Sequence, residues 1–172
     1  AINKNIRLIN VESIKELETI NSIGKSINKI VNIGIRLNPD INSNSLDKIS
    51  TGKKTDKFGI SLDQLKQIID LVKLSKYIKL QGISCHIGSQ INEISIYEKL
   101  FLTMKDLAQI IISNGIDIKY LDLGGGFAVN YEKNDDDLDI NIISKLINSI
   151  FSKVSYKLSF EPGRYLVAKS GI

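Results

Sequence analysis

The sequence predicts an α/β fold built from parallel β/α units, arranged as part of a (β/α)8 barrel. Five short apolar runs alternate with four segments of helical periodicity, which is the pattern of parallel strands joined by crossover helices. Polar or glycine-rich motifs follow three of these runs, as at the carboxyl face of a barrel. The chain has 172 residues, whereas a complete barrel typically needs about 250. We therefore expect a single domain over residues 1–172 that forms about five units of a barrel.

Apolar-leaning runs bounded by polar or turn residues define the expected strands. In chain order they are Ile6–Val11, Ile30–Leu37, Ile78–His86, Ile116–Leu123 and Tyr156–Phe160. The second run stops at Asn38-Pro39, because proline has no N–H to offer to the ladder. A polar stretch over residues 40–57 follows it and is longer than an ordinary connection, which indicates a functional or solvated loop.

Apolar residues at helical spacing predict four helices between these strands. Ser13 and Glu16 have the spacing of a capping box before the first helix. Ser61 and Gln64 repeat that spacing before the second helix, which we expect to end near Lys76. The apolar positions are Ile14, Leu17 and Ile20; Leu65, Ile68, Ile69 and Val72; Leu100, Met104, Leu107 and Ile111; and Ile143, Leu146, Ile147 and Ile150.

The last two helices carry further boundary signals. Asn114-Gly115 predicts a left-handed cap at the end of the third helix. The acidic run 134–139 precedes the fourth helix, where negative charge favours the positive end of the helix dipole.

Composition excludes several classes of function. The net charge is +4, but the lysines are scattered among acidic residues rather than gathered in one strip, so we expect no nucleic-acid partner. One cysteine and one histidine cannot build a structural zinc site or an internal disulfide, and we expect no metal. A single thiol fits a reducing compartment, which predicts the cytoplasm. No run approaches the roughly 18 apolar residues of a membrane span.

The only histidine lies in the motif S-C-H-I-G-S-Q over residues 84–90. His86 alternates with Ser84 and Gly82 on one face of the expected strand, so all three could point into a barrel. Cys85 lies on the opposite face and is expected to be structural.

Two further motifs end strands with glycines. L-D-L-G-G-G-F contains Gly124, Gly125 and Gly126, whose amides could bind a phosphate without help from charge. A dinucleotide fingerprint that begins at Gly124 would need glycine where Val129 stands.

The motif F-E-P-G-R-Y-L-V adds Glu161 at a strand end, followed by Pro162, Gly163 and Arg164. Gly163 lets backbone N–H groups approach a phosphate, and the guanidinium of Arg164 suits phosphate or carboxylate.

These three motifs, in this order, resemble the fold-type III pyridoxal-phosphate decarboxylases of the ornithine/diaminopimelate group. Residues 35–40 and 50–60 are similar to the middle region of the diaminopimelate branch. The arginine and ornithine branches share H-x-G-S and E-P-G-R and remain an alternative. The resemblance covers the chain nearly end to end. It implies the last five units of an alanine racemase-like barrel, with His86, the triple glycine and Glu161 on its sixth, seventh and eighth strands.

The resemblance also implies roles around pyridoxal 5'-phosphate. His86 would stack on the pyridoxal ring, with Arg36 near it, and Glu161 would face the pyridine nitrogen. Ser89 would donate to the phosphate. The remaining cofactor-binding residues implied are Gly124, Gly125, Gly126, Pro162, Gly163 and Arg164.

The implied reaction is decarboxylation of meso-diaminopimelate to L-lysine, with Arg164 reaching a substrate carboxylate. The family is dimeric, and Lys57 could contact the second subunit. Its Schiff-base lysine lies in an A-x-K-A-N type motif, and no lysine of this sequence stands in that context. Its C-terminal β-domain has no counterpart here either. A non-catalytic pyridoxal-phosphate-binding module is therefore a further alternative.

Overall fold

Parallel strands form one sheet in the computed structural model, which describes residues 1–4, 6–41, 58–131 and 138–170. The strands are β1 (Ile9–Val11), β2 (Val31–Asn38), β3 (Ile60–Ser61), β4 (Ile78–Ser84), β5 (Tyr120–Asp122) and β6 (Lys157–Ser159). Their order is β1-β2-β4-β5-β6, with β3 beside β2, and every pair is parallel. β1 and β6 stand at opposite ends of this order, so the described sheet is an open part of a barrel, as the sequence predicted.

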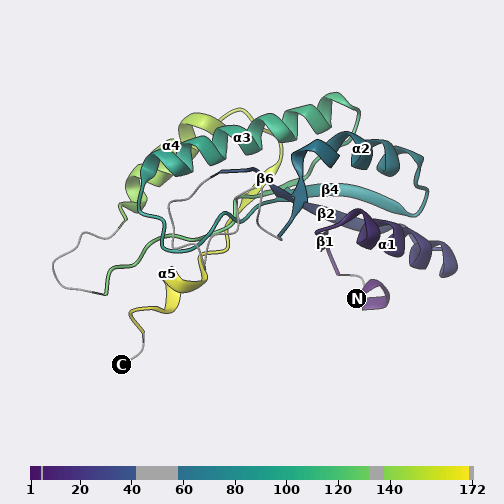
Figure 1. The fold of residues 1–172 in the computed structure, drawn as a ribbon, viewed down its shortest axis with the longest axis horizontal. Coiled ribbons are helices and arrows are strands. Elements are labelled where there is room, and N and C mark those ends of the chain that lie inside the picture. The colour runs from purple at the N-terminus through teal and green to yellow at the C-terminus, as the bar shows by residue number, and fades with distance from the viewer. Residues whose placement is uncertain (5, 42–57, 132–137, 171–172) are drawn as a thin grey trace.

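Helices connect successive strands and cover one face of the sheet. The α-helices are α1 (Ile14–Ser26), α2 (Leu65–Leu74), α3 (Ile94–Ser113), α4 (Ile140–Phe151) and α5 (Gly163–Val167), and the 3-10 helices are η1 (Ile2–Lys4) and η2 (Leu62–Gln64). Figure 1 shows α2, α3 and α4 together on one side of the strands. α1 packs against β1, β2 and β4, and α3 packs against α4.

The hydrophobic core lies between the sheet and these helices. Ile33, Ile35 and Leu37 alternate along β2 and are buried, as are Leu80 on β4 and Leu121 on β5. Successive side chains of a strand point to opposite faces. The alternate positions of the same strands therefore face away from the helices, and this second face carries the polar residues.

Only the first of the two predicted capping boxes forms, and it forms in part. The Ser13 hydroxyl accepts the N–H of Glu16 at 3.2 Å, as predicted. The Glu16 carboxylate, however, accepts the N–H of Glu12 at 2.6 Å. The reciprocal bond therefore falls one residue before the cap.

The prediction of a second capping box, at Ser61 and Gln64, was wrong. Ser61 makes no capping bond, and its hydroxyl donates to Asp63 instead. The backbone first forms the 3-10 turn η2, so α2 begins only at Leu65 and ends at Leu74 rather than near Lys76. The side chain of Asp63 competes for the hydroxyl that would have capped the helix.

The signals at the last two helices are confirmed where they are described. Gly115 follows the C-cap of α3, Asn114, and has φ +83°, the left-handed conformation expected there. Asp139 caps α4, because its Oδ1 accepts the N–H of Asn141 at 2.8 Å. The rest of the acidic run up to residue 137, and Lys57, lie outside the described residues.

Several element bounds differ from those predicted. β1 starts only at Ile9, after the turn of η1, and β5 starts only at Tyr120. β4 ends at Ser84, so His86 follows the strand rather than lying in it. The short elements β3 and α5 were not predicted, because two and five residues carry no readable periodicity. Among the described residues, no helix is long and apolar enough to span a membrane.

Candidate functional site

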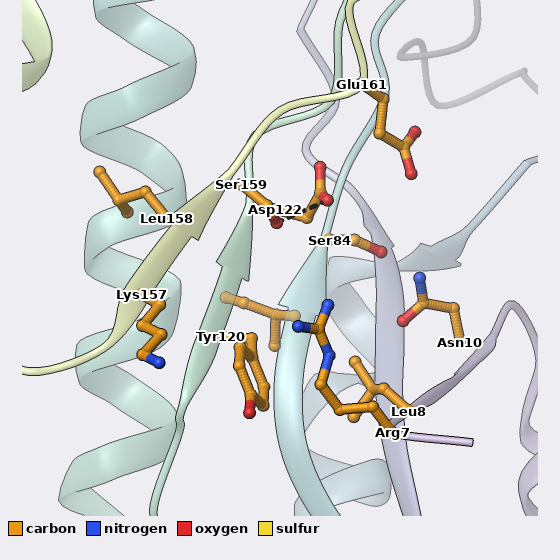
Figure 2. Close-up of a pocket in the computed structure, with 11 residues that line it drawn as sticks. Arg7, Leu8, Asn10, Ser84, Tyr120, Asp122, Lys157, Leu158, Ser159 and Glu161 are labelled. Carbon is orange, nitrogen blue, oxygen red and sulfur yellow. Dashed lines mark hydrogen bonds between the residues drawn. The ribbon is translucent and has the colours of Figure 1, made fainter.

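The face of the sheet opposite the helices is hollowed by a pocket of about 400 Å³. Its polar lining includes Asn10 on β1, Ser84 on β4, Asp122 on β5, Ser159 at the end of β6 and Glu161 just after it. These residues come from strand ends far apart in the sequence, and the parallel order brings them to one edge. Figure 2 shows the Glu161 side chain extending over this face above Asp122 and Ser84. The volume lies in the range of small-molecule sites, roughly 300–1,000 Å³.

Asp122 ties three parts of this edge together. Its Oδ2 accepts the hydroxyl of Ser159 at 2.7 Å, and its Oδ1 accepts the N–H of Gly124 at 2.8 Å. Asp122 and Ser159 are register partners across β5 and β6, which places both on the hollow face. Asp122 belongs to the motif L-D-L-G-G-G-F, but no role was predicted for it. The signal that could have found it is its position two residues before the glycines.

The triple glycine is a meeting point of three strand-end loops. A Cβ on Gly124 would overlap the carbonyl oxygen of Cys85, one on Gly125 that of Glu161, and one on Gly126 that of Gly88. Gly124 and Gly126 also have φ of +70° and +84°. Gly124 and Gly126 are therefore required for the close approach of the loop after β4, and Gly125 for that of the segment after β6.

Glu161 follows β6 and is held by backbone bonds to the glycine turn. Its N–H donates to the carbonyl of Gly124 at 2.7 Å, and its own carbonyl accepts the N–H of Gly163 at 2.9 Å. Burial raises the pKa of the Glu161 carboxyl, the Asp122 charge adds to the rise, and Arg36 opposes it. The group is thus placed where its protonation depends on two neighbouring charges.

His86 lies two residues beyond β4 and is half-buried. Burial lowers its pKa, Arg36 lowers it further, and Asp122 opposes the change. The imidazole is therefore favoured in its neutral form at neutral pH. Cys85 beside it is 2% exposed and its thiol points to the carbonyl of Asp122, which agrees with a structural residue. Burial raises the pKa of this thiol strongly.

Arg36 stands near the carboxyl end of β2 and is already engaged. Its Nη1 lies 2.8 Å from Oε1 of Glu12, and its guanidinium lies 5.4 Å from the ring centre of Phe58. The second oxygen of Glu12 accepts the N–H of Gly59 at 3.2 Å. The sequence did not predict Glu12 as a partner of Arg36. The two residues are 24 positions apart, and a lone carboxylate after a short strand carries no motif that would pair it with a distant arginine.

The E-P-G-R motif opens the short helix α5. Pro162 precedes its first residue, Gly163, and a Cβ on Gly163 would meet no atom within 4 Å. Arg164 is exposed and its Nη1 donates to the hydroxyl of Tyr131 at 3.3 Å. Ser89 is half-buried in the loop after β4, which the parallel bridge between Ile91 and Phe127 joins to the glycine turn.

A cluster of aromatic side chains packs near the ends of β5 and β6. The ring of Phe127 stacks on Tyr97 at 5.2 Å between centroids. It also lies 6.2 Å from both Phe160 and Tyr165. Phe160 and Tyr165 flank the E-P-G-R motif, so this packing sets the position of that motif against the glycine turn.

The sequence profile described as "Pyridoxal-dependent decarboxylase, pyridoxal binding domain" matches residues 1–168. The chain belongs to this family. Curated relatives named diaminopimelate decarboxylase include that of Aquifex aeolicus, 33% identical over 172 residues, and that of Haemophilus influenzae, 35% identical over 176 residues. Each match covers 100% of this chain and 41% of the relative, so the chain spans less than half the length of these proteins.

Solved structures agree with these matches. Diaminopimelate decarboxylase from Helicobacter pylori complexed with L-lysine superposes with a TM-score of 0.93 at 32% identity, covering 99% of this chain and 43% of that chain. An arginine decarboxylase of Paramecium bursaria Chlorella virus superposes at 0.75 and 22% identity, covering 95% of this chain and 41% of that one, and shows the fold alone.

The residues at the edge of the sheet fit pyridoxal phosphate, the cofactor of this family. The open backbone at Gly163 stands beside the cationic Arg164, which suits a phosphate group. Glu161 supplies an exposed carboxylate for a ring nitrogen, and the neutral imidazole of His86 suits contact with a ring face. Of the predicted site residues, Glu161 lines the 400 Å³ pocket, and the others lie near or after the carboxyl ends of β2, β4, β5 and β6.

Proposed function

We propose that this chain is the cofactor-binding part of a diaminopimelate decarboxylase, which converts meso-2,6-diaminopimelate to L-lysine and carbon dioxide. The observation that carries the proposal is identity of 33–35% over the whole chain to relatives of that name. A structural relative crystallised with L-lysine, the expected product, supports the substrate class. Residues 1–172 form one pyridoxal-phosphate-binding domain, a partial barrel, and the enzyme is a cytoplasmic homodimer.

Bound pyridoxal phosphate supplies a ring that takes up the electron pair left when carbon dioxide departs. Glu161 would hold a proton at the pyridine nitrogen, and Asp122 and Arg36 shift the pKa of that carboxyl in opposite directions. His86 would cover one ring face as a neutral imidazole. The ion pair with Glu12 holds the Arg36 side chain in place. Its positive charge would therefore act on the ring from a distance, without direct contact.

The phosphate is bound by groups that surround the glycine turn. Ser89 would donate its hydroxyl, and the backbone N–H groups of Gly125, Gly126 and Arg164 would complete the cradle. Gly124, Pro162 and Gly163 would shape its turns, because the N–H groups of Gly124 and Gly163 already donate to Asp122 Oδ1 and to the carbonyl of Glu161, and proline has no N–H. The guanidinium of Arg164 is exposed at the rim of the site, where it can reach a substrate carboxylate.

Substrate class is tested in a restored enzyme, in which the chain replaces the equivalent segment of the Helicobacter pylori diaminopimelate decarboxylase. Release of carbon dioxide is measured with meso-diaminopimelate, L-arginine and L-ornithine under equal conditions. We expect turnover of meso-diaminopimelate at least tenfold faster than of either basic amino acid, a difference of about 1.4 kcal/mol in barrier. Preference for arginine or ornithine would instead assign the chain to that branch.

The isolated chain serves as the second test, because its sequence has no A-x-K-A-N motif. We expect reversible binding of pyridoxal phosphate by the chain and no decarboxylation. Borohydride treatment should leave no stable adduct on any one lysine. Turnover by the isolated chain, or a single labelled lysine, would show that the covalent anchor lies within residues 1–172.

A further inference from the structure

The loop after β4 and the loop after β5 are joined by an unusual side-chain bridge. Gln90 Nε2 donates to the carbonyl of Val129 at 2.9 Å, and Gln90 Oε1 accepts the N–H of Val129 at 3.0 Å. The side-chain amide of Gln90 thus binds both the N–H and the carbonyl of Val129. Gln90 is half-buried and Val129 is 3% exposed, so these bonds are partly shielded from water.

The Gln90 amide extends a short backbone ladder. The N–H of Ile91 donates to the carbonyl of Gly126 at 2.8 Å, and the carbonyl of Ile91 accepts the N–H of Ala128 at 3.1 Å. These bonds form the isolated parallel bridge between Ile91 and Phe127. The side chain of Gln90 pairs with the next residue along, as a further strand residue would.

This ladder fixes two groups relative to each other. Ser89 immediately precedes Gln90, and Gly126 accepts the first bond of the ladder. Gln90 has φ +59°, a conformation that side-chain-bearing residues seldom adopt and that the bonds to Val129 help to hold. Gly126 also packs against the carbonyl of Gly88, so the two loops touch directly.

We propose that Gln90 is a positioning residue that holds the Ser89 loop and the glycine turn at the spacing needed to bind the cofactor phosphate. The inference rests on the proposed function, since it concerns the same cofactor. Gln90 acts through Ser89 and Gly126 and makes no contact with the ring. Its loss should therefore weaken recognition of the phosphate and leave recognition of the ring unchanged.

The test compares Gln90→Ala and Gln90→Met with the unsubstituted restored enzyme. Methionine keeps most of the bulk of glutamine but forms neither bond with Val129. Gln109→Ala, at an exposed position of α3, is the matched control. Affinity is measured for pyridoxal phosphate and for pyridoxal, which has the same ring without the phosphate.

Both Gln90 variants should bind pyridoxal phosphate about tenfold more weakly, the loss expected when two neutral hydrogen bonds no longer hold a loop. Pyridoxal affinity should stay within about twofold. Equal weakening of both ligands, or normal binding by Gln90→Met, would overturn the positioning role in favour of a general structural role or a role of bulk.

Hydrogen exchange in the isolated chain adds a readout that needs no cofactor. The amide of Val129 should exchange at least about tenfold faster in Gln90→Met than in the parent, because its acceptor is gone. Unchanged exchange would overturn the inference. Failure of the unsubstituted restored enzyme to bind pyridoxal phosphate would refute the proposed function and this inference with it, whereas normal binding by both Gln90 variants refutes the inference alone.

Discussion

Glu161 reaches its position through the backbone rather than through its own side chain. The bond from its N–H to Gly124 and the contact of its carbonyl with Gly125 place the residue. The carboxylate is then left to act on a ligand. This separation of anchoring from chemistry makes Glu161 suitable for a substitution that changes charge without changing shape.

We predict that Glu161→Gln in the restored enzyme slows decarboxylation and leaves cofactor affinity largely intact. Glutamine cannot supply the negative charge that favours a proton at the ring nitrogen. A charge-assisted hydrogen bond contributes about 1.5–3 kcal/mol, so kcat should fall by about tenfold to a hundredfold. Steady-state kcat and cofactor affinity are measured side by side. Collapse of affinity with unchanged kcat at saturating cofactor would make Glu161 an anchor instead.

His86 predicts a pH dependence of stability. Its pKa in the folded chain is lowered below 6.5, first by burial and then by Arg36. As pH falls below 6.5, the unfolded chain binds this proton before the folded chain does, so folding stability falls. The free energy of unfolding of the isolated chain should therefore decrease more steeply below pH 6.5 than that of His86→Gln. Identical slopes in urea titrations across this window would contradict the shift.

At the scale of elements, the two glycine motifs differ in what occupies the space that a side chain would fill. The Gly125 position is filled by the backbone of Glu161, so this glycine joins β5 to β6. The Gly163 position opens onto space, so that glycine leaves room for something else. Sequence alone treats both as turn residues near a strand end.

Substitution by alanine should separate these uses. Gly125→Ala should destabilise the isolated chain by about 1–3 kcal/mol or more, because backbone must shift to admit the methyl group. Gly163→Ala should leave the midpoint of thermal unfolding within about 2 °C of the parent, since it meets no atom and begins a helix. The same Gly163→Ala change should weaken the binding of pyridoxal phosphate to the restored enzyme. A destabilised Gly163→Ala would show that its open position is needed for folding.

For the whole molecule, the unequal pairing of strands sets the pattern of local stability. β2 and β4 have partners on both sides, whereas β1 and β6 each have one described partner. Amides of edge strands open to water more readily than those of central strands. Hydrogen exchange followed by mass spectrometry should show β1 and β6 exchanging faster than β2 and β4 in the isolated chain. In the restored enzyme, protection of β1 and β6 should rise; if it does not, the added segments leave the sheet open.

The sequence determined the succession of parallel units and the motifs at their ends, because both depend on local patterns. Apolar runs, helical spacing, Gly115 and Asp139 are signals within a few residues, and the structure agrees with them. The prediction from sequence was wrong where two local signals competed. The hydroxyl of Ser61 binds Asp63 instead of capping a helix. Elements as short as β3 and α5 carried too little pattern to be seen.

Tertiary structure decided which distant residues meet at the site. The hydrogen bonds between Asp122 and Ser159, between Glu12 and Arg36 and between Gln90 and Val129 span 24 to 39 residues, and no spacing rule encodes them. They arise because parallel strands bring their carboxyl ends to one edge, where each loop contacts the next. The sequence thus determined which groups are available for chemistry. The register of the sheet determined their neighbours, and through them the charge around Glu161 and His86.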